Sequence, residues 1–346
     1  MKRNIKALLA CAVLSLILQF IVLIWLDKFY LKENANVNVK EVSVNKPQEQ
    51  PEKNVDLPND MSTLQVSYNG KYLAYIKDSE LVIINSATGE EKSFTNKNQD
   101  EISYFTWLPD RNIMLVSTKE HTNKGKMFTL YNYDAEKNDA QKISDIAAAQ
   151  TGSKINSIKA STITGVTYIE IKSSPDKSSV YRMDINQTSS KKIDLQNSSL
   201  TGIFVVPREE RLIYQDRSGK VYLTQPKGNL TISHGIKAKV LGIDNESTVY
   251  LGEVSNGKIV KVLYGSLNSK NTSQWESKEL TTAADEKDIF ITSSGKILIN
   301  YSDSNALLDL KENKKMNYEG TFISVYNKGI TTSIDHKYHK TDFSKL

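Results

Sequence analysis

The sequence predicts an all-β fold built from repeated units of short antiparallel strands. No segment after residue 60 shows helical periodicity, which is the first observation behind this prediction. The second is the stretch from Ser67 to Phe94, where apolar strands alternate with clusters of turn residues, and the third is the recurrence of that pattern about six more times before the C-terminus. Because such a unit cannot bury both of its faces alone, each copy is expected to pack against the next.

The first unit shows the pattern most clearly. Asn69-Gly70 supplies a turn, since both residues tolerate a positive φ. Tyr72–Ile76 and Leu81–Ile84 are apolar runs with the length of buried strands, and Asn85–Gly89 is a second turn. Glu90–Phe94 is polar enough for an outer strand that has one face in solvent. The unit therefore predicts three strands joined by tight turns.

Later units follow at similar intervals. The corresponding turns are 43 residues apart on average, close to the roughly 40–45 residues of a four-stranded propeller blade. Residues 61–346 are therefore predicted to form a β-propeller of about seven four-stranded blades. The turns are found at these positions: Gly70, Arg111, Gly165, Glu209, Glu246, Gly295 and Lys328.

Several alternatives remain open from the sequence. The spacing is uneven, so six or eight blades are compatible with it. Residues 135–160 fit either blade strands or an insertion, and Ser173–Ser179 is interpreted as a loop. A pair of β-sandwiches with irregular hairpins would show a similar alternation of strands and turns.

The first unit also resembles a known family. Ser67–Tyr75 followed by Ala87–Glu90 is similar to the S-P-D-G-K-x-[IL]-A-[FY] … T-G-E unit of WD40-like propellers. That family includes the periplasmic propeller of the Tol system and the propeller domains of prolyl-oligopeptidase-type peptidases. Leu108–Asp110 and Ser174–Lys177 match the unit in part. The resemblance implies a propeller without the hydrolase domain of those peptidases, because no part of the chain is left to form one.

A second feature lies upstream of the repeats. Ala7–Leu26 is a run of twenty residues without a charge, and as a helix at ~1.5 Å per residue it would match the ~30 Å hydrocarbon core of a bilayer. Lys2, Arg3 and Lys6 precede it, which favours a cytoplasmic N-terminus. The sequence therefore predicts residues 1–6 as a cytoplasmic tail, residues 7–26 as a single transmembrane signal-anchor, and an extracytoplasmic C-terminal domain at the cell membrane.

Two other interpretations of this run are weaker. A cleaved secretory signal would have a shorter apolar core and a small-residue cleavage site, whereas the run ends in Ile24-Trp25-Leu26-Asp27. A lipoprotein signal would place the modified residue at Cys11, but fifteen uncharged residues of the run follow it. Cys11 is the only cysteine, so the rest of the chain has neither a disulfide nor thiol chemistry.

Residues 27–60 form a polar linker. Three of the seven prolines, Pro47, Pro51 and Pro58, lie there among Asn, Lys, Gln and Glu residues, and such a segment cannot bury enough apolar area to fold by itself. Within it, Val37–Leu57 carries scattered valines. This stretch is predicted to supply a ring-closing strand to the last blade, with a disordered tether as the alternative.

Composition and motifs indicate neither catalysis nor nucleic-acid binding. The net charge of +5 falls to about +2 without the N-terminal basic residues, far from the basic surface of a nucleic-acid binder. The common catalytic, phosphate-binding and cysteine-pair motifs are absent from the sequence. His336 and His339 would lie on opposite faces of a strand, and Asp303–Asn305 lacks the rest of a calcium loop. No catalytic residue, metal site or cofactor is therefore predicted.

The favoured function is that of a protein-interaction platform or accessory factor in a bacterial cell-envelope process. A bacterial source is inferred from composition, since only 6 of the 45 basic residues are arginine. Trp275 lies among polar residues and is the best candidate for an exposed aromatic contact with a partner protein. A sensor or receptor for a wall glycan, peptide or small ligand in the central channel is one alternative, and an enzyme of unrecognised type is another.

Overall fold

The computed structural model describes residues 2–26, 55–96, 100–123, 125–184, 189–233, 235–269 and 271–346. The chain separates into two compact units, Met1–Gln50 and Pro51–Leu346. The first contains helix α1 (Lys2–Trp25), whose side chains are described from Val13 onward. Nearly all large apolar side chains of that part of α1 are exposed. Among the residues described, no helix combines the length and the apolar character needed to cross a membrane.

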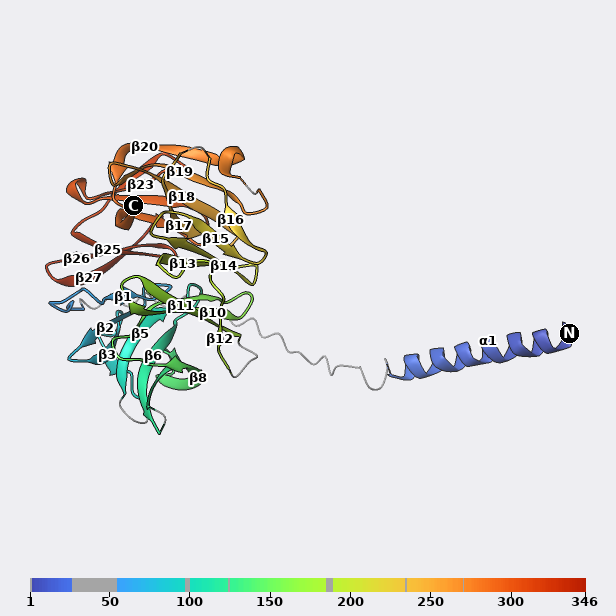
Figure 1. Ribbon diagram of the computed structural model, residues 1–346. Helices are drawn as coiled ribbons and strands as arrows, with labels where there is room; N and C mark the ends of the chain where they lie inside the picture. The colour runs from blue at the N-terminus through green and yellow to red at the C-terminus, as the bar shows by residue number, and fades with distance from the viewer. Residues whose placement is uncertain are drawn as a thin grey trace. The chain divides into compact units, whose positions relative to one another are not determined.

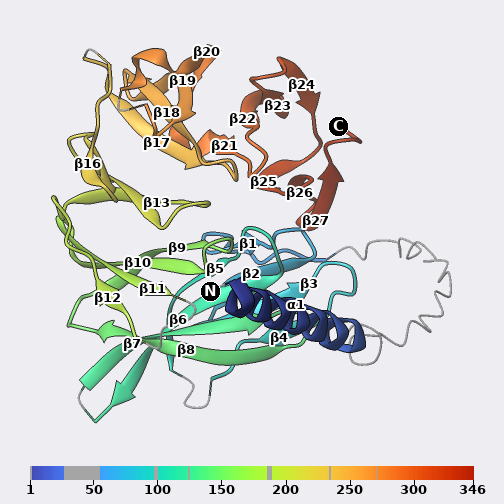
Figure 2. The same cartoon turned by 90° about the vertical axis from the view of Figure 1, so that its right-hand side faces the viewer.

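The second unit is a ring of seven antiparallel sheets (Figures 1 and 2). Six sheets have four strands and the last has three, and in each sheet the strands pair in the order of the sequence. The first strand of one sheet lies beside the first strand of the next, as at β5 and β9 or at β13 and β17. These first strands therefore surround a central channel. The predicted seven-bladed propeller is confirmed, and the alternative of two β-sandwiches is wrong.

The strands are short and cover most of the second unit. The first four sheets contain β1 (Gln65–Val66), β2 (Tyr72–Lys77), β3 (Glu80–Asn85), β4 (Glu91–Ser93), β5 (Glu101–Trp107), β6 (Ile113–Thr122), β7 (Gly125–Asp134), β8 (Asp139–Ala148), β9 (Lys154–Ser161), β10 (Val166–Ser174), β11 (Lys177–Asp184), β12 (Lys191–Lys192), β13 (Leu200–Val206), β14 (Arg211–Asp216), β15 (Val221–Thr224) and β16 (Lys227–Leu230). The last three contain β17 (Ala238–Ile243), β18 (Thr248–Ser255), β19 (Lys258–Ser266), β20 (Glu276–Ala284), β21 (Ile289–Ile291), β22 (Ile297–Tyr301), β23 (Ala306–Asp309), β24 (Lys314–Asn317), β25 (Thr321–Tyr326), β26 (Gly329–Ile334) and β27 (Lys337–Asp342). Within the described residues, three short 3₁₀ helices connect strands: η2 (Thr272–Gln274), η3 (Glu286–Asp288) and η4 (Ser302–Ser304).

The structure decides one segment that the sequence left open and corrects another. Residues 135–160 contain β8 and most of β9, so they form blade strands and not an insertion. Ser173–Ser179 is not a loop, because β10 and β11 stay paired as far as Ser174 and Lys177. The end of this hairpin is exposed, and an exposed hairpin end needs no apolar residue to mark it in the sequence.

Seven apolar clusters fill the spaces between neighbouring sheets. The first joins sheets one and two through Ala74, Ile83 and Val116. Equivalent clusters occupy the other six spaces, including the one between the last sheet and the first. The inner strands are therefore buried on both faces, as in β2, whose first four residues are all buried. This explains why these strands are continuous apolar runs in the sequence and not alternating ones.

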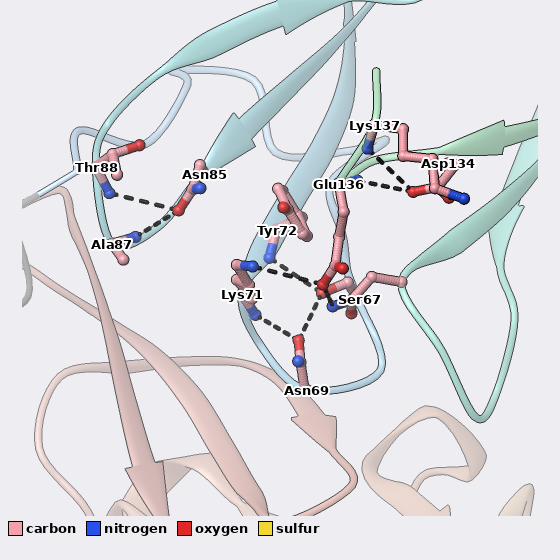
Figure 3. A network of polar contacts seen from close by, with 11 residues as sticks. Ser67, Asn69, Lys71, Tyr72, Asn85, Ala87, Thr88, Asp134, Glu136 and Lys137 are labelled. Atoms are coloured by element: carbon pink, nitrogen blue, oxygen red, sulfur yellow. Dashed lines mark hydrogen bonds and ion pairs between the residues drawn. The ribbon is translucent and has the colours of Figure 1, made fainter. Parts of the chain in front are cut away.

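The first turn of the ring is held by the turn residues themselves (Figure 3). Gly70 has a φ of 72°, which favours glycine. Asn69 Oδ1 accepts a hydrogen bond from the backbone N of Lys71 at 3.0 Å, and Ser67 Oγ accepts one from the backbone N of Tyr72 at 3.0 Å. The sequence pattern that predicted a turn therefore forms one through local side-chain to backbone hydrogen bonds.

A second turn motif recurs between the third and fourth strands of several sheets. Asn85 Oδ1 accepts from the backbone N of Ala87 at 3.0 Å in sheet one, and Asp134 Oδ1 accepts from the backbone N of Glu136 at 3.0 Å in sheet two (Figure 3). Asp309 caps the same turn in sheet six. The blades thus share a polar acceptor at one structural position, although the surrounding sequences differ.

The ring is closed by chain that precedes the first sheet. Leu57 N donates to His336 O at 2.8 Å, and Tyr338 N donates to Val55 O at 2.8 Å. The residue between them pairs with β27 in an antiparallel bridge, so this short segment takes the place of a fourth strand in the last sheet. The rest of the predicted closing stretch, residues 37–54, lies outside the described residues, as does the linker from residue 27.

Candidate functional site

Two adjoining cavities lie at one end of the channel, along the turns that follow the first strands of the sheets. The first has a volume of about 440 Å³, and sheets two to six contribute to its wall. The second, of about 470 Å³, is lined by sheets one, two, five, six and seven. Both include Thr106–Pro109, Leu241, Ile291 and Ser293 in their walls. We call the surface around these cavities the turn face.

The first cavity has a mostly apolar wall. Ile158 from β9, Phe204 and Val205 from β13, and Ile291 from β21 all contribute to it. Its hydroxyl groups include that of Ser161, which donates to the carbonyl oxygen of a residue in the next sheet at 2.6 Å. The wall thus offers apolar contact, with this hydroxyl group already engaged.

Two charged residues line the first cavity. Asp110 accepts hydrogen bonds from Arg111 Nη2 at 2.7 Å and Nε at 3.0 Å. These bonds hold the pKa of Asp110 below its usual value, although burial opposes the change. The Lys159 side chain is exposed in the cavity, and desolvation by the nearby protein wall lowers the pKa of Lys159. Among the described residues, Lys159 has no ion-pair partner.

The second cavity has a more polar wall and no charged side chain among its described lining residues. Asn327 Nδ2 donates to the Tyr68 hydroxyl at 2.6 Å, and the backbone N of Asn327 donates to the carbonyl oxygen of Tyr68 at 3.0 Å. These bonds join the last sheet to the first at the turn face. Gln65 Nε2 donates across to sheet two, to the carbonyl oxygen of Phe105 at 2.9 Å. The wall of the second cavity thus contains polar contacts between sheets.

An apolar groove of about 190 Å³ continues from the first cavity to the space between sheets two and three. It shares Leu108, Ala160 and Thr162 with the cavity wall, and Ile143 of β8 lies at its far side. In the described part of the second unit, only three large apolar side chains are exposed. Two of them border these sites: Ile143, 40% exposed, lines the groove, and Ile163, 57% exposed, lines the first cavity. Exposed apolar side chains therefore lie in both the first cavity and the groove that adjoins it.

Trp275 does not lie at these sites, and the prediction that it is exposed is wrong. Its side chain is 9% exposed and belongs to the apolar cluster between sheets four and five. The ring packs against Gly265 of β19, where a Cβ atom would come within 2.5 Å of Trp275 Cγ. The polar neighbours of Trp275 gave no sign of this contact, because the space for the ring comes from a glycine on another strand.

The weaker metal candidates from the sequence are not brought together. His336 lies in a turn with a φ of 61°, and His339 follows on β27. In the regions that the structure describes, no three His, Cys, Asp or Glu side chains gather as a metal ion would require. Asp244 lies in a turn, as its sequence context indicated, and accepts from the backbone N of Glu246 at 2.9 Å.

Two solved structures share the arrangement described above. A chain in the crystal structure of the mitotic checkpoint complex aligns with a TM-score of 0.52 and 11% identity, over 85% of this chain and 95% of that one. The protein described here therefore has the fold of a β-propeller. A chain from a structural and mechanistic study of two prolyl endopeptidases aligns with a TM-score of 0.50 and 11% identity, over 78% of this chain and 45% of that one. At this identity the likeness concerns the fold alone.

Sequence comparison adds nothing further. No protein-family model matches the chain, and a comparison with curated proteins finds no match. The expected similarity to propellers of the prolyl-oligopeptidase type is thus confirmed for the fold.

Proposed function

We propose that this protein is a membrane-anchored, extracytoplasmic binding platform for another protein, and that the partner docks on the turn face. The observation that carries the proposal is the pair of exposed isoleucines, Ile163 in the first cavity and Ile143 in the apolar groove that shares wall residues with it. Large apolar side chains that are exposed together on a folded domain mark interaction sites more often than isolated ones do. Polar residues rim this surface, as is typical of a protein interface.

The cavities favour binding over catalysis. A catalytic site needs an acid and a base, or a nucleophile and a base, within hydrogen-bond reach. Asp110 is engaged by Arg111, and no ion pair joins it to Lys159 among the described contacts. The remaining lining of the first cavity is apolar or carries neutral hydroxyl and amide groups. Such a wall suits recognition of a chain segment.

A receptor for a small polar ligand is the second candidate function. The second cavity favours it, because its wall carries the hydroxyl and amide groups of Ser67, Tyr68, Thr292 and Asn327. Groups of this kind recognise sugars and peptides through hydrogen bonds. Tyr68 and Asn327 already bond to each other, however. The apolar surface around Ile163 has no comparable internal partner, so the platform is preferred.

The membrane anchor is proposed from the N-terminal sequence. Ala7–Leu26 carries no charge and follows three basic residues, and the large apolar side chains of α1 from Val13 to Trp25 are not covered by protein. A bilayer would cover them. The anchor would hold the propeller at the outer surface of the cell membrane, where a partner of the cell envelope could reach it.

The orientation of the anchor gives a direct prediction. Lys287 is exposed on η3, so a Cys11→Ala, Lys287→Cys variant carries a single accessible thiol in the propeller. We expect a membrane-impermeant maleimide to label this thiol in intact cells to the same extent as in lysed cells. Labelling that requires lysis would contradict the proposed topology.

Partner docking can be tested with a photo-crosslinking side chain at Thr162, next to the exposed isoleucine. The full-length chain in its native membrane is expected to capture a defined protein. Ile163→Asp should lower the crosslinked yield about tenfold, since a buried interface side chain contributes on the order of 1–2 kcal/mol. Met61→Asp is the matched control, because Met61 is 40% exposed and lies outside the turn face. Equal yields from both variants would contradict the proposal.

A further inference from the structure

Lys159 is the one cation in the described linings of the two cavities. It lies on β9 between Ile158 and Ala160, and all three residues contribute to the wall of the first cavity. The Lys159 side chain is exposed at this wall, beside the apolar side chain of Ile158. A segment that filled the cavity would remove water from the ammonium group, and this costs free energy unless the segment brings an opposite charge.

Two arginines close to the first cavity already have partners. Arg111 pairs with Asp110 at 2.7 Å and Arg208 pairs with Glu246 at 2.6 Å. In the described part of the chain, Lys159 makes no such pair, and the acidic residue of its own cavity is held by Arg111. The first cavity therefore contains a positive charge that nothing in the described chain neutralises.

A neighbouring apolar path determines what kind of anion fits. From Lys159 the cavity continues past Leu108 and Thr162 into the groove that ends at Ile143. A free small anion would make no use of this path. An extended chain segment would place apolar side chains along it and could bring one acidic group to the lysine. A single ammonium without a neighbouring cation matches one negative charge, which suits a carboxylate better than a dianionic phosphate.

We propose that the turn face binds a chain segment of the partner that carries a carboxylate, and that this carboxylate pairs with Lys159 while apolar side chains of the segment occupy the groove toward Ile143. This inference rests on the proposed function and names the chemistry of the partner. The bound segment would exclude water from the pair, so the pair would contribute more than an exposed salt bridge does. The carboxylate can belong to an Asp or Glu side chain or to the C-terminus of the partner.

Three pools of N-acetylated octapeptides with degenerate apolar and hydroxyl positions test the inference. The first pool carries one central Glu and an amidated C-terminus, the second has no acidic residue and a free C-terminal carboxylate, and the third has neither. Binding to the full-length chain in detergent is measured by retention on the immobilised protein. We expect the first or second pool to be retained at least about tenfold more than the third. The preferred pool identifies the source of the carboxylate.

Variants of β9 assign the effect to one side chain. Lys159→Gln should reduce the preference for the acidic pool to less than about twofold, and Lys159→Arg should keep most of it, because arginine retains the charge. Lys154→Gln is the matched control, since Lys154 is an exposed lysine of the same strand that does not line the cavity. Thermal unfolding of each variant shows that a loss of binding does not come from a loss of fold.

Three results would overturn the inference, and they differ in what they say of the docking site. If all three pools bind wild-type protein equally and Ile163→Asp abolishes that binding, the platform stands and the carboxylate is wrong. If no pool binds, the inference is also overturned, and the crosslinking at Thr162 then decides separately whether the turn face is a docking site. A preference for acidic pools that survives in Lys159→Gln would likewise exclude Lys159 as the partner of the carboxylate.

Discussion

Replacing Asp216 with alanine is expected to lower the free energy of unfolding by about 3–5 kcal/mol. Asp216 ends β14 and is 3% exposed. Its Oδ1 accepts from the backbone N of Ser218 at 2.9 Å, the hydroxyl of Ser218 at 2.6 Å and the backbone N of Lys220 at 3.0 Å. Its Oδ2 accepts from Asn197 Nδ2 at 2.8 Å and the Tyr222 hydroxyl at 2.9 Å. Alanine would leave several donors in the protein interior without an acceptor.

Denaturant unfolding followed by tryptophan fluorescence measures the effect, because Trp107 and Trp275 are both nearly buried. Asp216→Asn keeps the size of the side chain and one acceptor oxygen, so its loss should be smaller. Asp139→Ala is the control, since Asp139 is an exposed residue of β8 and should change stability by less than about 0.5 kcal/mol. An Asp216→Ala variant as stable as this control would show that the network contributes little.

The same network predicts how stability depends on pH. Burial alone would raise the pKa of Asp216, but the hydrogen bonds from Ser218, Tyr222 and Lys220 outweigh it and hold the pKa below the usual value near 3.8. A carboxylate with a lowered pKa in the folded state contributes stability above its unfolded pKa and loses it as the pH falls through the folded pKa. Acidification below about pH 4 should therefore destabilise wild-type protein more than the Asp216→Asn variant.

The hydrogen-bond arrangement of Asp216 recurs at a turn in another sheet, where the sequence does not show the likeness. Asp244, in sheet five, accepts from the backbone N of Thr248 at 2.9 Å and from the Tyr250 hydroxyl at 2.8 Å. In both turns the aspartate bonds to the backbone four residues later and to a tyrosine six residues later. The residue types between them differ, because most of these bonds come from the backbone of the turn; the Ser218 hydroxyl is an addition in the first turn. This repetition becomes visible once the hydrogen bonds are known.

The blade count was predictable from the sequence because the strands that carry it are buried on both faces. Tyr72–Lys77 and Ile297–Tyr301 have to be apolar at nearly every position to fill the spaces between sheets. The outer strands carry no such requirement: β12 is Lys191–Lys192 and β16 begins at Lys227. Their pairing depends on the preceding strand, so their own residues say little about them.

The candidate site could not be predicted from the sequence, for a different reason. Lys159 is one of many lysines, and it becomes distinctive because seven first strands surround the same channel. Ile163 offered a local sign, as an isoleucine among the polar residues of a turn. The polar neighbours of Trp275 also indicated an exposed side chain, but Trp275 is buried in the core. Whether an isolated apolar side chain is exposed depends on its neighbours across the sheet, and these are distant in sequence.

Replacing Leu57 with aspartate is expected to lower the free energy of unfolding by at least about 4 kcal/mol. Leu57 is 7% exposed and packs with Leu73, Ile84 and Tyr338 in the cluster between the last sheet and the first. Removal of a buried leucine side chain costs about 2–5 kcal/mol, and a carboxylate in its place adds the cost of desolvating a charge. The substitution should also disturb the pairing of Val55–Leu57 with β27, which would leave β27 as an unpaired edge.

Met61→Asp is again the matched control, because it introduces the same charge four residues later at an exposed side chain. Unfolding midpoints of the two variants in denaturant give the comparison, and hydrogen exchange of the amide of Tyr338, which donates to Val55 O, reports on the pairing itself. Fast exchange at Tyr338 in Leu57→Asp with protected amides elsewhere would mean that the ring opens locally before it unfolds. Equal midpoints and equal protection in both variants would mean that the last sheet is held by its three strands and the contacts with sheet six, so that closure through Val55–Leu57 is dispensable.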